Sequence, residues 1–96
     1  MGLRFEWHKE KARRNVEKHG VSFEEAQTVF YDRLARIFYD EVHSEDDLRE
    51  IIIGYSSHER VLLVCFTERA PALIRIISAR GATRRERRDY EKNRYT

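Results

Sequence analysis

The segment from Cys65 to Glu91 reads CFTERAPALIRIISARGATRRERRDYE and contains the features that decide the fold. Apolar residues dominate Val61–Thr67 and Leu73–Ala79, which predicts two strands. The connection at Arg69–Ala72 is short and contains Pro71, a residue favoured in turns. Strands joined by so short a turn pair antiparallel, because a parallel pair needs a long crossover.

A helix is predicted to follow this hairpin. Thr83-Arg84-Arg85-Glu86 fits a capping box. In this motif the Thr and Glu side chains each accept a hydrogen bond from the other residue's backbone N–H. We expect the helix to run to about Lys92.

Upstream, the sequence predicts one strand and two helices. Leu3–Trp7 alternates apolar and charged residues, as a short strand does. Lys9–His19 is typical of a helix, and Gly20 suits its left-handed cap. Ser22-Phe23-Glu24-Glu25 is a second capping box that opens the next helix. Its core stripe, at helical spacing, consists of Phe23, Ala26, Val29 and Phe30.

The middle of the chain is predicted to be strand-rich. Strands are expected at Arg36–Tyr39 and Leu48–Tyr55, and an acidic loop with His43 separates them over Glu41–Asp47. A turn at Ser56–Glu59 leads to the hairpin. The predicted order is β-α-α-β-β-β-β-α, an α+β fold with two N-terminal helices and one C-terminal helix on one side of an antiparallel sheet. Residues 1–96 are expected to form a single domain.

Composition points to a charged surface with an uneven distribution. Charged residues make up 38% of the chain, above the typical quarter. Residues 1–68 carry 10 Lys/Arg and 14 Asp/Glu, whereas residues 69–96 carry 9 Lys/Arg and 3 Asp/Glu. The basic C-terminal part suggests a polyanion or an acidic partner, although a solvated helix face would look the same.

The sequence is expected to belong to a cytoplasmic protein with no role in a membrane. No apolar run approaches the roughly 20 residues of a membrane helix, and the N-terminus lacks the apolar stretch of a signal peptide. Cys65 is the only cysteine, which agrees with a reducing compartment. In the apolar run VLLVCF it is more typical of a small core residue than of a nucleophile.

Metal and cofactor chemistry is not predicted. The histidines are His8, His19, His43 and His58, and none has a partner at a spacing typical of zinc sites. The sequence contains no glycine-rich phosphate loop and no GxSxG elbow.

Arg75 is unusual because it interrupts an otherwise apolar strand. By alternation it shares a face with Leu73, Ile77 and Ala79, and it is costly to bury unless it faces a groove or a partner. Guanidinium groups bind phosphate and stabilise the charge that develops during RNA cleavage. We expect Arg75 to converge with Glu68, Arg69 and Arg80. Alternatively, Arg75 forms a buried ion pair with Glu50 or Glu68 that only fixes the fold.

A ribonuclease that uses the 2′-hydroxyl of RNA as nucleophile also needs groups that move protons. Arginine is a poor proton donor, so the candidates are Glu68, Lys18, His19 and Tyr90. Histidine has the most suitable proton affinity near neutral pH. His19 precedes the capping glycine, however, where it would equally stabilise the helix end through the helix dipole.

The C-terminal helix is expected to bind phosphate. Four arginines lie in its first two turns, and Arg84 and Arg88 share one face. Positive charge near a helix N-terminus opposes the dipole, a mild cost that anion binding would offset. We expect Arg84, Arg85, Arg88 and Tyr90 to contact RNA, the arginines without reading its sequence.

Three blocks make the chain similar to the BrnT family of toxins with a RelE-like fold. The first is FEW at Phe5–Trp7 with N-x-x-KHGVSFEEA at Asn15–Ala26. The second is VFxD at Val29–Asp32 with D-x-x-HSE-x-x-x-R at Asp40–Arg49. The third is TER with IRIISAR-x-ATRRERR-x-YE, at Thr67–Glu91.

The resemblance implies a metal-independent endoribonuclease that inhibits translation and growth. It also implies a BrnA-type antitoxin with a ribbon-helix-helix domain, through which the complex would bind operator DNA and repress its operon. By motif position, Glu68, Arg69, Arg75 and Arg80 correspond to the active-site group, and Lys18 and His19 would contact RNA. Two positions depart from the family pattern, with His8 in place of Asp and Arg33 in place of Pro.

Two alternative functions remain open at the sequence level. The chain would be a binding module without catalysis if its basic tail only docks an acidic partner or DNA. It would be a degenerate toxin if it still binds an antitoxin but has lost activity. The intact TER and IRIISAR motifs speak against degeneration.

Overall fold

The computed structural model of the chain describes residues 2–41 and 48–94. The elements follow the predicted order, with a single 3₁₀ turn, η1, continuing the second helix. They are β1 (Arg4–Glu6), α1 (Lys9–His19), α2 (Phe23–Thr28), η1 (Val29–Tyr31), β2 (Arg36–Tyr39), β3 (Glu50–Tyr55), β4 (Val61–Ala70), β5 (Leu73–Gly81) and α3 (Arg84–Asn93).

The strands form one sheet in the order β1-β5-β4-β3-β2. The meander from β2 to β5 is antiparallel, as predicted. β1 instead runs parallel to β5, with Phe5 opposite Ile74. The expected antiparallel sheet therefore contains one parallel pair at its edge, whose two strands lie at opposite ends of the sequence.

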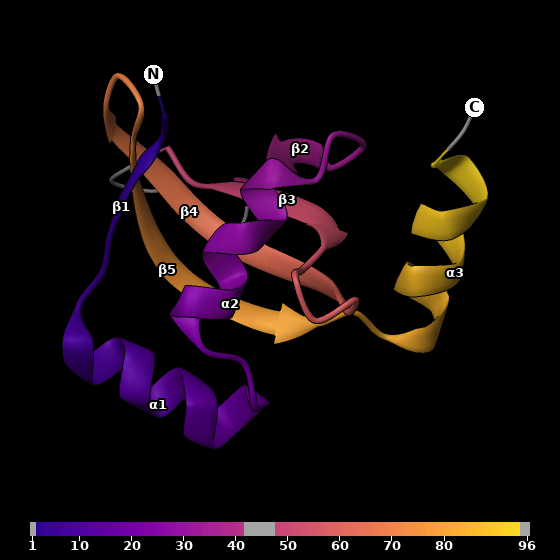
Figure 1. Ribbon diagram of the computed structural model, residues 1–96, viewed down its shortest axis with the longest axis horizontal. Coiled ribbons are helices and arrows are strands. Elements are labelled where there is room, and N and C mark those ends of the chain that lie inside the picture. The colour runs from indigo at the N-terminus through magenta and orange to yellow at the C-terminus, as the bar shows by residue number, and fades with distance from the viewer. Residues whose placement is uncertain (1, 42–47, 95–96) are drawn as a thin grey trace.

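Helices α1 and α2 cover one face of the sheet (Figure 1). The core lies between them and the sheet, and Phe30 bridges Phe5 and Phe66 there with ring-centroid distances of 5.2 and 4.9 Å. The predicted stripe of α2 is buried, since Phe23, Ala26 and Val29 have no exposed surface. Helix α3 stands at the end of the sheet instead of joining the other two helices, which corrects the prediction that all helices share one side.

The ends of the strands differ modestly from the sequence-based ranges. β4 and β5 each extend further, to Ala70 and Gly81, and β3 begins at Glu50 instead of Leu48. The acidic loop predicted over Glu41–Asp47 falls at 42–47, outside the described residues, and so does His43.

A β-bulge in the β4–β5 pair changes which residues of β5 face the core. The register shifts between Cys65 and Phe66, so that Cys65 lies opposite Ser78 while Phe66 lies opposite Ile76. Ala79 is consequently 2% exposed and packs in the core. The prediction that Ala79 shares a face with Arg75 was wrong, because a bulge adds one residue and breaks the period-2 alternation.

The helix caps follow the sequence with one exception. Gly20 ends α1 at φ 68°, and the Thr83 capping box forms both of its hydrogen bonds. The Ser22 side chain accepts from the N–H of Glu25, but the Glu25 side chain does not return the bond. It is buried against Arg60 and Ser56 instead. His8, at the N-cap of α1, makes no side-chain capping bond.

A polar cluster holds α3 against the body. Tyr90 is the buried residue of this helix, and its hydroxyl donates to Asp32 Oδ2 at 2.8 Å. Arg94 Nη1 and Nη2 donate to the two oxygens of the same carboxylate, at 2.8 and 3.0 Å. Burial by itself raises the pKa of Asp32, but hydrogen bonds from Arg94 and from the N–H groups of Tyr55 and Leu34 hold that pKa well below its usual range. Asp32 is therefore ionised at neutral pH.

No helix within 2–41 or 48–94 combines the length and apolar character needed to span a membrane.

Candidate active site on the open face of the sheet

A groove of about 330 Å³ crosses the face of the sheet opposite α1 and α2. Its floor is apolar and is formed by Ile51, Leu63 and Ile77, one from each of three neighbouring strands. Its remaining lining residues are polar or small: His19, Asp40, Arg49, Cys65, Ser78, Ala79 and Arg80. Two of the residues predicted for chemistry, His19 and Arg80, thus meet in one groove.

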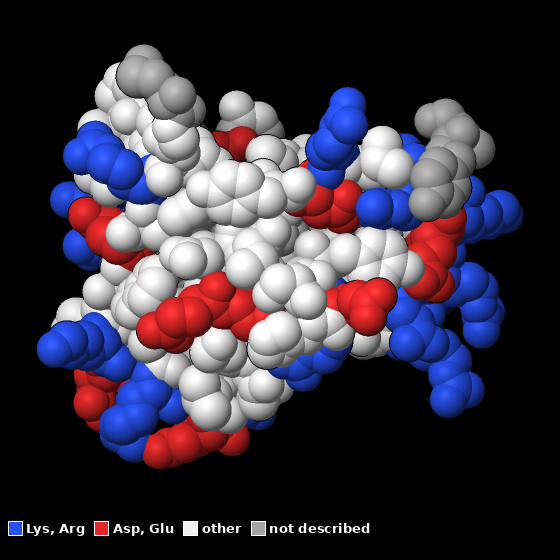
Figure 2. Space-filling view, in the orientation of Figure 1, with Lys and Arg blue, Asp and Glu red and all other residues white. Residues whose placement is uncertain are grey.

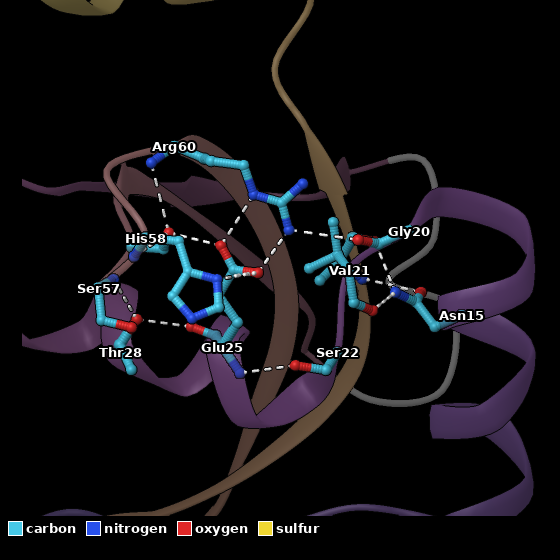
Figure 3. Close-up of polar contacts among 11 residues, drawn as sticks. Asn15, Gly20, Val21, Ser22, Glu25, Thr28, Ser57, His58 and Arg60 are labelled. Atoms are coloured by element: carbon cyan, nitrogen blue, oxygen red, sulfur yellow. Dashed lines mark hydrogen bonds and ion pairs between the residues drawn. The ribbon is translucent and has the colours of Figure 1, made fainter.

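Asn15 positions His19 beside the end of β5. Its buried side-chain amide donates to the carbonyl of Ala79 at 2.8 Å and accepts from the N–H of Ala79 at 3.1 Å. A third bond, to the carbonyl of Val21 at 2.8 Å, fixes the turn after the helix. Figure 3 shows the Asn15 side chain extending from α1 toward β5. Because Ala79 precedes Arg80 and Asn15 lies one turn before His19, this contact brings the two groove residues together.

A second buried polar group, Glu25, supports the same turn (Figure 3). Its carboxylate accepts from Ser56 Oγ at 2.6 Å and from Arg60 Nε at 3.0 Å. Arg60 in turn donates to the carbonyl of Gly20 at 3.2 Å. The Arg60 guanidinium, helped by Ser56, lowers the pKa of Glu25 against the opposing effect of burial. The ion pair therefore holds the residue that follows His19.

Arg80 is oriented by Glu86 at the start of α3. Two guanidinium nitrogens donate to the two carboxylate oxygens at 2.8 and 2.9 Å. The hydrogen bond from Arg80 is the main cause that lowers the pKa of Glu86 to about 2. Glu86 is thus ionised at neutral pH and is a poor general base. The planar pair fixes the direction of the guanidinium, and its Nη1 also donates to the carbonyl of Gly81 at 3.3 Å.

Asp40 and Arg49 close the groove on the β2–β3 side. The backbone N–H of Asp40 donates to the carbonyl of Arg49 at 3.0 Å. The thiol of Cys65 lies 3.8 Å from Asp40 Oδ2. Burial and the nearby carboxylate raise the pKa of Cys65. A protonated thiol is a weak nucleophile. Cys65 is nevertheless not the core residue that was predicted, because it is half-buried and lines the groove.

Arg75 lies outside the groove. Its Nε donates to Glu6 Oε2 at 2.8 Å, across the parallel pair of β1 and β5. Arg75 therefore does form an ion pair, but with Glu6 instead of Glu50 or Glu68, and the two side chains are 42% and 35% exposed instead of buried. Arg75 and Arg80 are five residues apart on one strand, which separates them by about 16 Å.

Glu68 and Arg69 lie at the far end of the β4–β5 hairpin. Both are exposed, and Glu68 accepts from the N–H of Ala72 in the turn at 3.2 Å. The expected convergence of Glu68, Arg69, Arg75 and Arg80 is not found, because Arg80 lies at the opposite end of β5 and the other three lie near the turn.

The remaining predicted residues divide into exposed and buried groups. Lys18, Arg84, Arg85 and Arg88 are exposed. Basic side chains gather over α3, on the right of Figure 2. Tyr90 is 4% exposed, and burial together with its bond to Asp32 raises its pKa to about 12. Its hydroxyl is therefore bound within the fold and is unsuited to proton transfer near neutral pH, and the buried side chain does not offer the RNA contact that was predicted.

Arg49 and Asp40 were missed as site residues in the sequence analysis. They are the first and last residues of the D-x-x-HSE-x-x-x-R block, which was recognised but given no chemical role. Asp40 directly follows β2 and Arg49 directly precedes β3, and because these two strands pair antiparallel, the two residues lie side by side. Across 2–41 and 48–94, no three His, Cys, Asp or Glu residues group closely enough to hold a metal ion.

Comparison with known proteins identifies the family. A search of curated proteins finds no match to the chain. Among solved structures, the fold is similar to the 1.1 Å crystal structure of the Brucella abortus ribonuclease toxin BrnT, with a TM-score of 0.66 and 23% identity over 85% of this chain and 99% of that one. The family model described as ribonuclease toxin, BrnT, of type II toxin–antitoxin system matches residues 7–86. The chain therefore belongs to the BrnT family of ribonuclease toxins, whose type II systems pair each toxin with an antitoxin.

Proposed function

We propose that this chain is a metal-independent endoribonuclease whose active site is the groove between His19 and Arg80. The observation that carries the proposal is the meeting of one imidazole and two guanidinium groups, from His19, Arg49 and Arg80, around one hollow. These residue types supply proton transfer and phosphate binding, the two needs of RNA cleavage through the 2′-hydroxyl.

In the proposed reaction the 2′-oxygen attacks the adjacent phosphorus, and the bond to the 5′-oxygen breaks. His19 accepts the proton of the 2′-hydroxyl, and water protonates the departing 5′-oxygen. Arg80 and Arg49 stabilise the negative charge on the phosphate oxygens in the transition state. The products are a 2′,3′-cyclic phosphate and a 5′-hydroxyl.

RNA is proposed to continue from the groove across α3. Lys18 lies beside His19, and Arg84, Arg85 and Arg88 are exposed on the helix that Glu86 ties to Arg80. Such contacts would bind phosphates irrespective of sequence, so that affinity should fall steeply with salt. The motif-based roles of Glu68, Arg69 and Arg75 remain a separate prediction, concerning the other end of β5.

The biological setting is proposed from family membership. We infer that the protein acts in the cytoplasm and that a BrnA-type ribbon-helix-helix antitoxin neutralises it. The toxin–antitoxin complex would bind operator DNA through the antitoxin. An antitoxin that covers this groove should present acidic residues, and its association should then slow at high salt.

The test is cleavage of RNA by the purified chain in EDTA, with analysis of the fragment ends. We expect cyclic phosphate ends from the parent protein. His19→Gln should reduce kcat by roughly 10²- to 10⁴-fold, the usual contribution of a general base. Arg80→Ala should reduce kcat by roughly 10²- to 10³-fold, as the loss of a charge-stabilising donor does.

His8→Gln is the matched control, because His8 is exposed at the other end of α1. It should cleave as the parent does. Arg75→Ala distinguishes the two site assignments: full activity places catalysis in the groove alone, whereas inactivity of a folded Arg75→Ala protein with active His19→Gln would overturn the groove assignment. No cleavage by the parent under any condition would favour the non-catalytic binding module.

A further inference from the structure

Exposed apolar side chains form a run along one edge strand of the sheet. Seven large hydrophobic residues in the described chain are exposed, and three of them are consecutive in β2. Strand β2 contributes Ile37, Phe38 and Tyr39, which are 55%, 47% and 64% exposed. Patches of this kind mark interaction surfaces on soluble domains.

The hydrogen-bonding groups of β2 show which residues are available for a further strand. The N–H of Asp40 donates to Arg49, its cross-strand partner, so this pair is of the hydrogen-bonded kind. Such pairs alternate along an antiparallel ladder, and therefore Phe38 and Arg36 also bond to β3. The backbone groups of Ile37 and Tyr39 point away from the sheet, with two N–H and two C=O groups at the open edge.

The opposite edge lacks these properties. Strand β1 has three residues, two of which, Arg4 and Glu6, are charged. Short strands and charged side chains protect sheet edges from pairing. Strand β2 has neither a proline nor a charge at its two outward-bonding positions, so its edge is the one suited to strand addition.

The sequence from Arg36 to Asp40 is complementary to itself when two copies run antiparallel. With Phe38 opposite Phe38 of a second copy, the outward-bonding residues Ile37 and Tyr39 face each other and form four interchain hydrogen bonds. Arg36 then lies opposite Asp40 of the other copy, twice. Aromatic pairs and opposite charges at directly opposed positions stabilise a sheet, and the arrangement has the two-fold symmetry of most homodimers.

We propose that the chain forms a homodimer through β2, with the two-fold axis at Phe38 and the two sheets joined into one of ten strands. The occupant of this edge is a second copy because the strand's own sequence is complementary to itself in hydrogen bonding, aromatic contact and charge, although Arg36 also donates to the carbonyl of Asn93 and Asp40 accepts from Cys65 within each chain. The proposal is independent of the ribonuclease assignment. An edge this short buries less than the roughly 1,200 Å² of a standard interface, so we expect micromolar rather than nanomolar affinity.

The first test is sedimentation of the full chain between about 1 μM and about 1 mM, the range of micromolar dissociation constants. We expect the sedimentation coefficient to rise from monomer to dimer. Phe38→Asp should remain monomeric throughout, because it opposes two carboxylates at the axis. A parent chain that stays monomeric over this range would overturn the proposal.

The second test fixes the register by crosslinking. Phe38→Cys, in a chain with Cys65→Ala, should form an interchain disulfide on mild oxidation. Directly opposed residues of a non-hydrogen-bonded pair have Cα atoms about 4.5 Å apart, within disulfide range. Val16→Cys is the matched control, since Val16 is 47% exposed but lies on α1. Equal crosslinking of the two proteins would refute the specific interface.

The third test exchanges charges. Arg36→Asp and Asp40→Arg should each weaken self-association, because like charges then face each other. An equimolar mixture of the two should form a heterodimer in which every opposed pair is again Asp with Arg. Circular dichroism establishes that both variants are folded. Two folded variants that fail to associate when mixed would argue against the register.

Discussion

Replacing Asp32 with alanine is expected to be among the most damaging single changes on the surface between α3 and the body. The carboxylate side chain is 5% exposed and Arg94 is 17% exposed, so the pair is largely desolvated. Asp32 also accepts from Tyr90 and from the backbone N–H groups of Tyr55 and Leu34. Its loss would remove the carboxylate that accepts from both the Arg94 guanidinium and the Tyr90 hydroxyl.

Removing one partner of a buried ion pair typically costs about 3–5 kcal/mol. A domain of this size has a free energy of unfolding of about 5–15 kcal/mol. Asp32→Ala should therefore lose a large share of its stability, with a fall in Tm of at least about 12 °C. Helix α3 should loosen first, because Tyr90 is its buried anchor.

The measurement is urea denaturation followed by circular dichroism, with hydrogen exchange of the α3 amides. Asp89→Ala is the control, an exposed acidic residue on the same helix, and should change stability by less than about 0.5 kcal/mol. The double variant with Arg94→Met should lose less than the two single changes together, by up to about 3 kcal/mol. A loss below about 1 kcal/mol in Asp32→Ala, with an unchanged m-value, would refute the reasoning.

Three further predictions concern acid stability, packing and thiol reactivity. The fold lowers the pKa of Asp32 and that of Glu86, the latter to about 2. Both carboxylates therefore stabilise the fold fully above their unfolded pKa values near about 4, and this stabilisation should be lost as pH falls toward 2. Urea midpoints between pH 7 and pH 2 measure the loss, and Glu86→Gln should make the midpoint depend less on pH. Gly54→Ala would place a Cβ 2.9 Å from that of Ala35, and we expect a loss of about 1–3 kcal/mol in thermal denaturation, whereas Gly2→Ala, with nothing within 4 Å, should be neutral. Cys65 should react with iodoacetamide more slowly than a free thiol at pH 8, and an equal rate would contradict the raised pKa.

Local sequence signals predicted most of the secondary structure. Helix α1, its cap at Gly20 and the capping box at Thr83 depend on residues within a few positions of one another, and all three are found as expected. The four-strand meander followed from short connections. The same rules applied at Ser22 were only half right, because burial gave the Glu25 side chain a partner distant in sequence, Arg60.

The candidate site was less predictable, because its members are distant in the chain. His19 and Arg80 were both expected to take part in chemistry, but their meeting depends on the amide of Asn15 bonding to Ala79. Arg49 belongs to the recognised D-x-x-HSE-x-x-x-R block, but the sequence assigned it no chemical role. Glu68, Arg69, Arg75 and Arg80 were expected to converge because they are close in sequence. Strand β5, however, separates Arg75 from Arg80 by about 16 Å.

Hydrophobic period and turn chemistry act over a few residues, and so the sequence by itself determined most of the elements and their order. The family came from the resemblance of its three motif blocks. Which strand borders β5, which carboxylate pairs with Arg75 and which side of the sheet receives Ala79 were decided only by the tertiary structure. Each of these depends on strand pairing across the whole chain or on a single bulge. A one-residue shift in a strand exchanges its two faces, and no local pattern records where that shift occurs.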